Sequence, residues 1–410
     1  MNPKNLSICN FDYLLPEEKI ASFPLEKRDQ SKLLIFESGV ITEDIYFNIA
    51  AHFPKKSLLV FNDTKVIKAR ILFQKPSGGV IEIFCLEPYE DVKDYAVVLQ
   101  KKDHIRWKCM IGGASKWKHS FLEKTAVIDG NKIQLKASLV EKLSDAYVVE
   151  FSWDPGQYSF AEIMEIAGDT PLPPYIKRKP EDIDVKRYQT IYSKYEGSVA
   201  APTAGLHFTP HIFFSFKEKN ISTGFTTLHV GAGTFKPVKS ASMGGHEMHA
   251  EWMEVSTDFI KLILKNLTNA IICVGTTSVR TIESLFWMGI KTMLNPDQST
   301  DELALKQWEV YDKSFIENTS SPEKALTSLL QFLQKKKTKK LLIQTQIIIA
   351  PGYQFKLTKG LVTNFHQPKS TLLLLVAAMA GKDWKRIYNY ALENEFRFLS
   401  YGDGCLIFNS

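Results

Sequence analysis

The sequence of 410 residues has few cysteines and no long apolar run. Its five cysteines are odd in number and far apart, and no two form a CxxC pair, which argues against a disulfide framework or a cysteine-based zinc site. The longest apolar block, Leu372 to Ala380, is much shorter than the ~20 residues that cross a bilayer. The first residues lack the basic and then apolar order of a signal peptide. We therefore expect a cytoplasmic protein without a membrane-spanning segment.

The sequence also has little excess of charge of one sign. Lys and Arg number 51 against 45 Asp and Glu, a formal net charge of +6. This balance excludes a polybasic-tail protein, and it permits a polyanionic partner without requiring one. Hydrophobic residues make up 44% of the chain, which excludes wholesale disorder. The length predicts two or three domains with a sizeable core.

Residues 66–152 differ in pattern from the rest of the chain. Short β-rich runs there alternate with turn signals such as Ser77-Gly78-Gly79 and Asp129-Gly130-Asn131, which is typical of a small barrel or sandwich. Helical and strand patterns mix on both sides of this block. We predict an α/β domain formed by residues 1–65 and 153–410, with a small antiparallel β-barrel domain, residues 66–152, inserted into it.

Three segments of small and polar residues contain histidines or an acid. Asp63 directly follows an apolar strand, where ligand-binding groups collect in α/β domains. His207 lies in an uncharged stretch of small residues, and His229 precedes the glycines at positions 231 and 233. A dinucleotide-binding GxGxxG would need glycine where the chain has Lys236. A capped turn and structural histidines remain the alternative interpretation.

Two further segments lead into helices. Thr276, Thr277 and Ser278 form a hydroxyl-rich turn ahead of Arg280 and Glu283, and free N–H groups at such a helix start suit an anionic group. An ordinary helix cap with a surface ion pair is the alternative. His366 precedes an apolar helix that Ser370 is expected to cap.

A metal site is not expected. His246 and His249 lie three residues apart, whereas the zincin motif places its second histidine four residues after the first.

Basic residues cluster in the β-rich block, where they alternate with tryptophan. Lysines that hold phosphates, together with aromatic side chains that stack on bases, are a recurrent combination in single-stranded RNA binding. A solvated charged face is the alternative. The candidates for an RNA surface are Lys65, Arg70, Lys101, Lys102, Arg106, Trp107, Lys177 and Arg178.

Taken together, ten segments in this order resemble one family, the S-adenosylmethionine:tRNA ribosyltransferase-isomerases of queuosine biosynthesis. No single segment is specific, but their shared order along nearly the whole chain is. The segments are 11–34, 62–70, 172–176, 197–209, 228–235, 246–252, 274–284, 351–355, 363–371 and 396–403. The chain is longer than most members, and the surplus falls largely at 295–340, which we expect to be a helical insertion in the catalytic domain.

The resemblance implies an α/β domain with an inserted β-barrel and a defined reaction. The enzyme would transfer and isomerise the ribosyl moiety of S-adenosylmethionine onto an aminomethyl-deazaguanine at the tRNA wobble position, giving epoxyqueuosine-tRNA and releasing adenine and methionine. The tRNA would carry a GUN-type anticodon, and S-adenosylmethionine would be a substrate with no further cofactor. We expect a monomer. A divergent paralogue, such as a methyltransferase acting on tRNA, and a non-catalytic tRNA-binding protein are the alternatives.

This chemistry needs a base for the ribose methylene beside the sulfonium and an acid for the leaving adenine. Our hypothesis draws both from the histidines and carboxylates of the matching segments: His207, His229, His366, Asp63 and Glu283. Small, hydroxylated, cationic and aromatic residues of the same segments are the candidates for S-adenosylmethionine binding: Gly231, Gly233, Thr276, Thr277, Ser278, Arg280, Phe208 and Tyr401.

Overall fold

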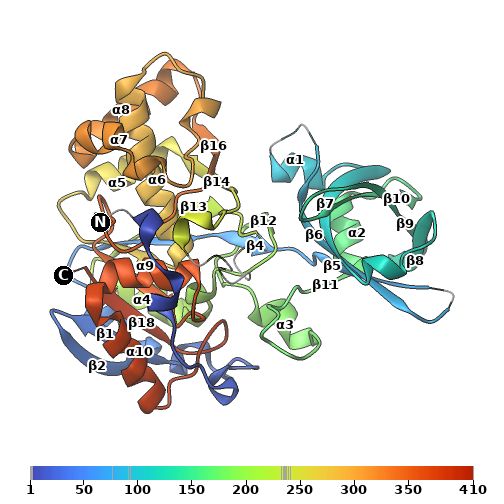
Figure 1. The fold of residues 1–410 in the computed structure, drawn as a ribbon, viewed down its shortest axis with the longest axis horizontal. Coiled ribbons are helices and arrows are strands. Elements are labelled where there is room, and N and C mark those ends of the chain that lie inside the picture. Colours follow the sequence, from blue (N-terminus) through green and yellow to red (C-terminus); the bar gives the residue numbers. More distant parts are fainter. Residues whose placement is uncertain are drawn as a thin grey trace.

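The computed structural model describes residues 3–409 except 76, 91, 93, 232, 234–237, 239 and 241. Two β-sheets of different kind lie side by side, a large mixed sheet flanked by helices and a smaller curled one (Figure 1). This arrangement confirms the predicted fold class in its coarse form, an α/β part interrupted by an antiparallel β part.

The large sheet has nine strands in the order β16-β14-β13-β3-β15-β17-β18-β1-β2. Its centre is parallel, from β13 through β3 and β15 to β17, while β18 pairs antiparallel with β17 and parallel with β1. The three central strands β3, β15 and β17 are buried along their whole length, as their apolar composition demands. The strands are β1 Lys32–Glu37, β2 Val40–Ile45, β3 Leu58–Asn62, β13 Ser222–Leu228, β14 Glu251–Ser256, β15 Ile271–Val274, β16 Lys340–Thr345, β17 Gly360–Asn364 and β18 Gly404–Phe408.

Helices cover both faces of this sheet. Alternate residues of a strand enter two different cores, since Leu58 and Val60 pack in one cluster and Leu59 and Phe61 in the other. The first cluster contains residues of α5, α6, α8, α9 and α10, and the second contains residues of α4 and the 3-10 helix η5 Tyr46–His52. The helices are α4 Pro210–Glu218, α5 Thr257–Lys265, α6 Thr276–Leu294, α8 Pro322–Lys335, α9 Thr371–Ala380 and α10 Trp384–Glu393.

The smaller sheet curls around the helix α2, Phe160–Ala167 (Figure 1). Its order is β11-β5-β6-β7-β10-β9-β8, with antiparallel pairing throughout. Among the described residues, the two end strands β8 and β11 do not pair with each other. The sheet is therefore curled but not closed into a barrel. Its strands are β5 Arg70–Gln74, β6 Val80–Pro88, β7 His104–Gly112, β8 Phe121–Ile128, β9 Asn131–Lys142, β10 Tyr147–Asp154 and β11 Gly168–Asp169.

The core of the curled sheet includes α2, which follows the predicted boundary at residue 152. Phe160 and Ile163 of this helix are fully buried among the strands. We therefore propose that the inserted unit extends from Arg70 to Asp169, whereas the boundaries drawn from the sequence were 66–152.

A two-stranded parallel ribbon links the two sheets. In it β4, Thr64–Val66, pairs with β12, Tyr195–Ser198, so the chain leaves the large sheet and returns to it at neighbouring points. The short helices α1, Tyr95–Leu99, and α3, Asp182–Arg187, complete this region (Figure 1).

The segment 295–340 is helical only in part. It contains η10 Asp301–Leu303, η11 Glu309–Tyr311, α7 Lys313–Glu317 and α8, which packs along α6. The close approach of these two helices requires glycine at position 289, because a Cβ there would lie 2.2 Å from the carbonyl oxygen of Ala325. In the described part of the chain, no helix has the length and apolar character needed to cross a membrane.

Candidate functional site

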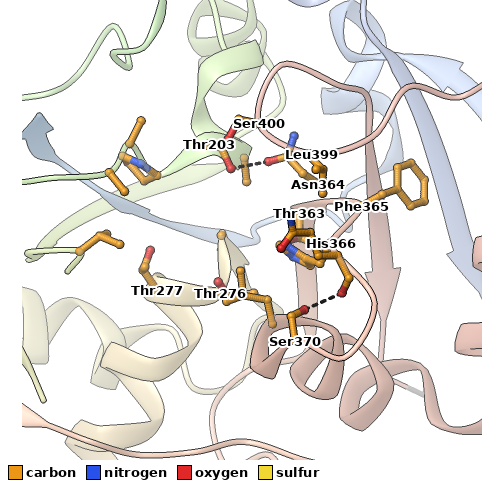
Figure 2. A pocket seen from close by; sticks show the side chains of 18 of the residues that line it. Thr203, Thr276, Thr277, Thr363, Asn364, Phe365, His366, Ser370, Leu399 and Ser400 are labelled. Carbon is orange, nitrogen blue, oxygen red and sulfur yellow. Dashed lines mark hydrogen bonds between the residues drawn. The ribbon is translucent and has the colours of Figure 1, made fainter. Parts of the chain in front are cut away.

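A cavity lies where β17 ends and where α6 begins after β15 (Figure 2). We call it the strand-end cavity; ligands commonly bind beyond the carboxyl ends of strands in α/β sheets. Hydroxyls, two amides and one imidazole line it, and they come from segments that are far apart in the chain. The polar residues that line it are Thr203, Thr276, Thr277, Thr363, Asn364, His366, Gln367, Ser370 and Ser400.

His366 is the histidine of the strand-end cavity. Its Nε2 lies 2.8 Å from the hydroxyl of Thr363, and Figure 2 shows the two side chains next to each other. Its backbone is held by two tyrosines, since its N–H donates to Tyr388 at 3.0 Å and its carbonyl accepts from Tyr13. Burial lowers the pKa of the His366 ring to about 3.

His207 lies behind the cavity and does not line it. Its ring stacks on Tyr46, with ring centroids 4.2 Å apart, and its Nε2 lies 3.3 Å from the amide nitrogen of Asn364. The amide oxygen of Asn364 accepts from Thr203 at 2.7 Å, so Asn364 connects the buried imidazole to the cavity wall. Burial lowers the pKa of His207 to about 3.

His229 lies between the two sheets. Its Nδ1 is 3.0 Å from the hydroxyl of Thr64, and its ring stacks on Tyr95 of the inserted unit at 4.6 Å. Only glycine fits at position 197, because a Cβ there would lie 2.7 Å from Tyr95 and 2.8 Å from His229. Burial lowers the pKa of His229 to about 4. His229 lines a cavity of about 230 Å³ between the two sheets, which we call the interface cavity. Its other lining residues include Glu87, Lys108, Glu251 and Trp252.

A third cavity, of about 330 Å³, adjoins the other two. We call it the arginine cavity, because Arg280 forms part of its wall. It shares Leu372 with the strand-end cavity, and Gly231 and Gly233 with the interface cavity. The predicted glycine turn therefore does line cavities, although its residues 232, 234 and 235 lie outside the described part of the chain.

Arg280 is 7% exposed and paired with a carboxylate. Its Nη1 forms an ion pair with Glu251, and its Nε donates to the carbonyl of Ile347 at 3.1 Å. Glu251 also accepts from the N–H of Gly231 at 3.3 Å. Thus Glu251 fixes both the guanidinium and the start of the glycine turn.

Glu283, a predicted catalytic residue, is held by protein groups, and its catalytic role stays a prediction. This carboxylate is fully buried and accepts hydrogen bonds from the loop ahead of β17. The donors are Tyr353 Oη, the N–H groups of residues 356, 357 and 358, and the hydroxyl of Thr358, at 2.8–3.0 Å. A carboxylate saturated in this way anchors backbone and has no free lone pair to offer a ligand.

Asp63 is also held by protein groups. Its Oδ1 accepts from Thr227 at 2.7 Å, its backbone carbonyl accepts from the N–H of Lys194 at 2.7 Å, and it is not among the residues that line the three cavities. Burial raises the pKa of Asp63 to about 6. Its role as an acid or base stays a prediction.

Four further candidates are buried and do not line any of these three cavities. Phe208 is fully buried in an aromatic cluster and Trp107 in the centre of the curled sheet, so neither presents a ring to a ligand. Tyr401 donates to Asp184 at 2.7 Å, and Ser278 donates to the carbonyl of Val274 at 2.8 Å. Burial gives no support to a binding role for Phe208 or Trp107, and these roles stay predictions.

The cations predicted to hold RNA are mostly paired with acids. Six of the eight candidates, all except Lys102 and Trp107, have a carboxylate partner. Their local charge is therefore largely neutralised, and contact with RNA stays a prediction. The pairs are Lys65–Glu196, Arg70–Glu82, Lys101–Glu90, Arg106–Glu150, Lys177–Glu17 and Arg178–Asp184, at 2.7–3.1 Å.

The sequence did not point to several residues of these cavities. Asn364 and Glu251 lie within the segments 363–371 and 246–252, which the resemblance had already singled out. The available signal for Asn364 was its place close to His366, and for Glu251 its place at the start of a strand. Tyr95 gave none, because it reaches His229 from the inserted unit across a long sequence separation. Among the described residues, no group of three or more His, Cys, Asp or Glu side chains has the arrangement of a metal site.

Comparison with known proteins gives one consistent result. A family model described as a queuosine biosynthesis protein matches residues 8–407. Proteins named S-adenosylmethionine:tRNA ribosyltransferase-isomerase from Halothermothrix orenii and Caldanaerobacter subterraneus subsp. tengcongensis are both 36% identical, over 98% and 97% of this chain and 100% and 98% of theirs. A crystal structure of S-adenosylmethionine tRNA ribosyltransferase from Thermotoga maritima is 26% identical, covers 97% of this chain and 99% of its own, and has a TM-score of 0.44.

Proposed function

This chain belongs to the family of queuosine biosynthesis proteins, and on that premise we propose that it is an S-adenosylmethionine:tRNA ribosyltransferase-isomerase. The observation that carries this proposal is the extent of the match: the family model spans residues 8–407, and two relatives with that name are 36% identical over nearly the whole chain. The three cavities, which share lining residues with one another, support it, because a large nucleoside substrate occupies more than one neighbouring subsite.

The reaction attaches the ribosyl moiety of S-adenosylmethionine to the aminomethyl group of a deazaguanine in tRNA and rearranges it. We propose epoxyqueuosine-tRNA, adenine and methionine as products, with S-adenosylmethionine as substrate and no further cofactor. The partner would be a tRNA with a GUN-type anticodon that already carries the precursor base, and we propose that the enzyme acts as a cytoplasmic monomer.

We propose the strand-end cavity as the place of the ribose. Thr276, Thr277 and Asn364 would meet its hydroxyls, and His366 would take the proton from the methylene beside the sulfonium. The ring is neutral at pH 7 and has a lone pair to accept a proton, but burial, which lowers the pKa of His366 to about 3, also makes it a weak base, so in this role its pKa has to rise when the cationic substrate and its counter-charges fill the cavity. The pKa values of His207 and His229 are lowered in the same way, so none of the three holds an imidazolium proton to donate to adenine at pH 7.

The deciding experiment is incubation of the purified protein with S-adenosylmethionine and tRNA bearing the aminomethyl-deazaguanine, followed by mass analysis of nucleosides and free products. We expect epoxyqueuosine with stoichiometric adenine and methionine. Release of S-adenosylhomocysteine would instead identify a methyltransferase, and binding of tRNA without turnover would identify a non-catalytic protein. A His366→Gln variant is expected to lose most adenine release, while tRNA without the modified base serves as the substrate control.

A further inference from the structure

The guanidinium of Arg280 has one nitrogen without a protein partner. Nε is bound to the carbonyl of Ile347 and Nη1 to Glu251, but Nη2 is buried and has no hydrogen-bond partner among the described residues. A buried N–H group without an acceptor is costly and rare. The wall of the arginine cavity formed by Arg280 therefore lacks an acceptor that a ligand is able to supply.

The rest of this cavity is lined by apolar side chains, by two carboxylates and by two histidines. Its apolar wall consists of side chains from the segment after β16 and from α9: Ile347, Ile348, Ile349, Leu372 and Leu375. The two carboxylates are those of Glu251 and the exposed Glu247, and the two histidines are His246 and His249. The two carboxylates disfavour a phosphate, which carries more negative charge than one guanidinium offsets.

We propose that the arginine cavity binds the α-amino-acid end of S-adenosylmethionine, with Arg280 donating to its carboxylate. The inference rests on the proposed function and assigns one part of the substrate to one part of the site. A carboxylate meets the unpartnered guanidinium nitrogen, the short methylene chain and sulfonium lie along the aliphatic wall, and the ammonium group lies toward Glu247. Glu251 is a positioning residue, because it acts on the ligand through Arg280.

The position of the cavity agrees with this assignment. Leu372 lines both the arginine cavity and the strand-end cavity, so a ligand with its carboxylate at Arg280 extends its ribose toward Thr276, Thr277 and His366. The amino-acid end and the reacting methylene are then held by different segments of the chain. Loss of the carboxylate contact should weaken binding without removing the group that accepts the proton.

The test compares two ligands that differ only in the carboxylate: S-adenosylmethionine and its decarboxylated analogue. Calorimetry with the wild-type protein should show a preference for S-adenosylmethionine of about 10- to 100-fold, the scale of a charge-assisted hydrogen bond. In a variant with both Arg280→Met and Glu251→Gln the preference should fall to about one, with binding of the analogue changed by less than about threefold. The double change avoids leaving Glu251 buried without its partner.

Arg280→Lys gives an independent reading, because it keeps a cation beside Glu251 but loses the planar fork. We expect the preference to fall about tenfold. Arg386→Met, which removes an exposed arginine paired with Asp383, is the matched control and should keep the full preference. Equal binding of both ligands by the wild type, or a full preference in the folded double variant, would overturn the inference. A wild-type protein that binds S-adenosylmethionine with the expected preference but fails to modify tRNA would contradict the proposed function alone.

Discussion

At the scale of single residues, burial determines the charge of the histidines around the cavities. The folded pKa values of His207 and His366 lie at about 3 and that of His229 at about 4, against 6.5 in the unfolded chain. Between these values the unfolded chain binds more protons, so the stability that each neutral ring contributes is lost as the pH falls below about 6.5. Asp63 has the opposite effect, because its pKa is raised by burial. The stability contributed by its protonated carboxyl group is present at low pH and is lost as the pH rises through about 6. In that range it offsets the pH dependence of one histidine.

We predict that the free energy of unfolding decreases between pH 7 and pH 5, by about 1.4 kcal/mol per pH unit for each buried histidine below its unfolded pKa. A His366→Gln variant should lose about 2 kcal/mol of this dependence. Urea unfolding at several pH values measures it, with His119→Gln, at an exposed position in the inserted unit, as the control. An unchanged slope for the His366 variant would show that this ring is not held neutral.

At the scale of elements, Glu283 joins α6 to the loop that leads into β17. Three backbone N–H groups and two hydroxyls converge on its two oxygens. In Glu283→Gln the new amide group faces donors where the second oxygen accepted, so at least one buried N–H loses its partner. We predict a loss of about 2–4 kcal/mol in stability, measured by urea unfolding, with adenine release kept within about threefold below the unfolding temperature. Glu317→Gln, which removes an exposed ion pair of α7, is the control. A large loss of turnover in a stable Glu283→Gln protein would contradict the prediction and support a catalytic role for Glu283.

Local sequence signals predicted elements better than they predicted the faces of those elements. The apolar runs of β3 and β15 and the capping hydroxyl of Ser370, which accepts from Leu373 at 3.2 Å, are confirmed. Thr209 precedes α4 in the same way, but its hydroxyl does not cap that helix and donates instead to Asp29 at 2.9 Å. Trp107 was placed with Arg106 on an RNA surface, although neighbours in a strand point to opposite faces. The strand alternates between exposed and buried residues, with Trp107 inside.

At the scale of the whole molecule, short segments that are far apart in the sequence meet at the strand ends, and several residues singled out from the sequence line cavities there. Thr276, Thr277 and His366 line the strand-end cavity, and Arg280 lines the next. What the sequence missed depends on long-range packing. The stacking of Tyr95 on His229 joins the inserted unit to the large sheet, and no local pattern encodes that contact.

The pairing of the basic side chains leads to a prediction about RNA. With most candidate cations neutralised, we expect few released counterions, and therefore a modest salt dependence of tRNA binding: about a 20-fold loss of affinity between 50 and 200 mM salt if about three phosphates are contacted. Fluorescence anisotropy with labelled tRNA measures the slope. Lys102 is exposed and forms no ion pair with another residue that the structure describes, so Lys102→Ala should lower the slope by about 0.7. Lys313→Ala in α7, distant from the curled sheet (Figure 1), should not, and affinity independent of salt would contradict the prediction.

The position of β18 in the large sheet has a consequence for synthesis of the chain. Leu33 of β1 pairs with Gly404, and Asn364 of β17 pairs with the same residue from the other side. The hairpin of β1 and β2 therefore has no connection to the rest of the sheet until residues 404–408 have left the ribosome. At about 5–20 residues per second, that hairpin waits on the order of 20–70 s with an unpaired, apolar edge. During translation, the first strand made is among the last to be joined, and a chaperone that shields strand edges has its longest opportunity there.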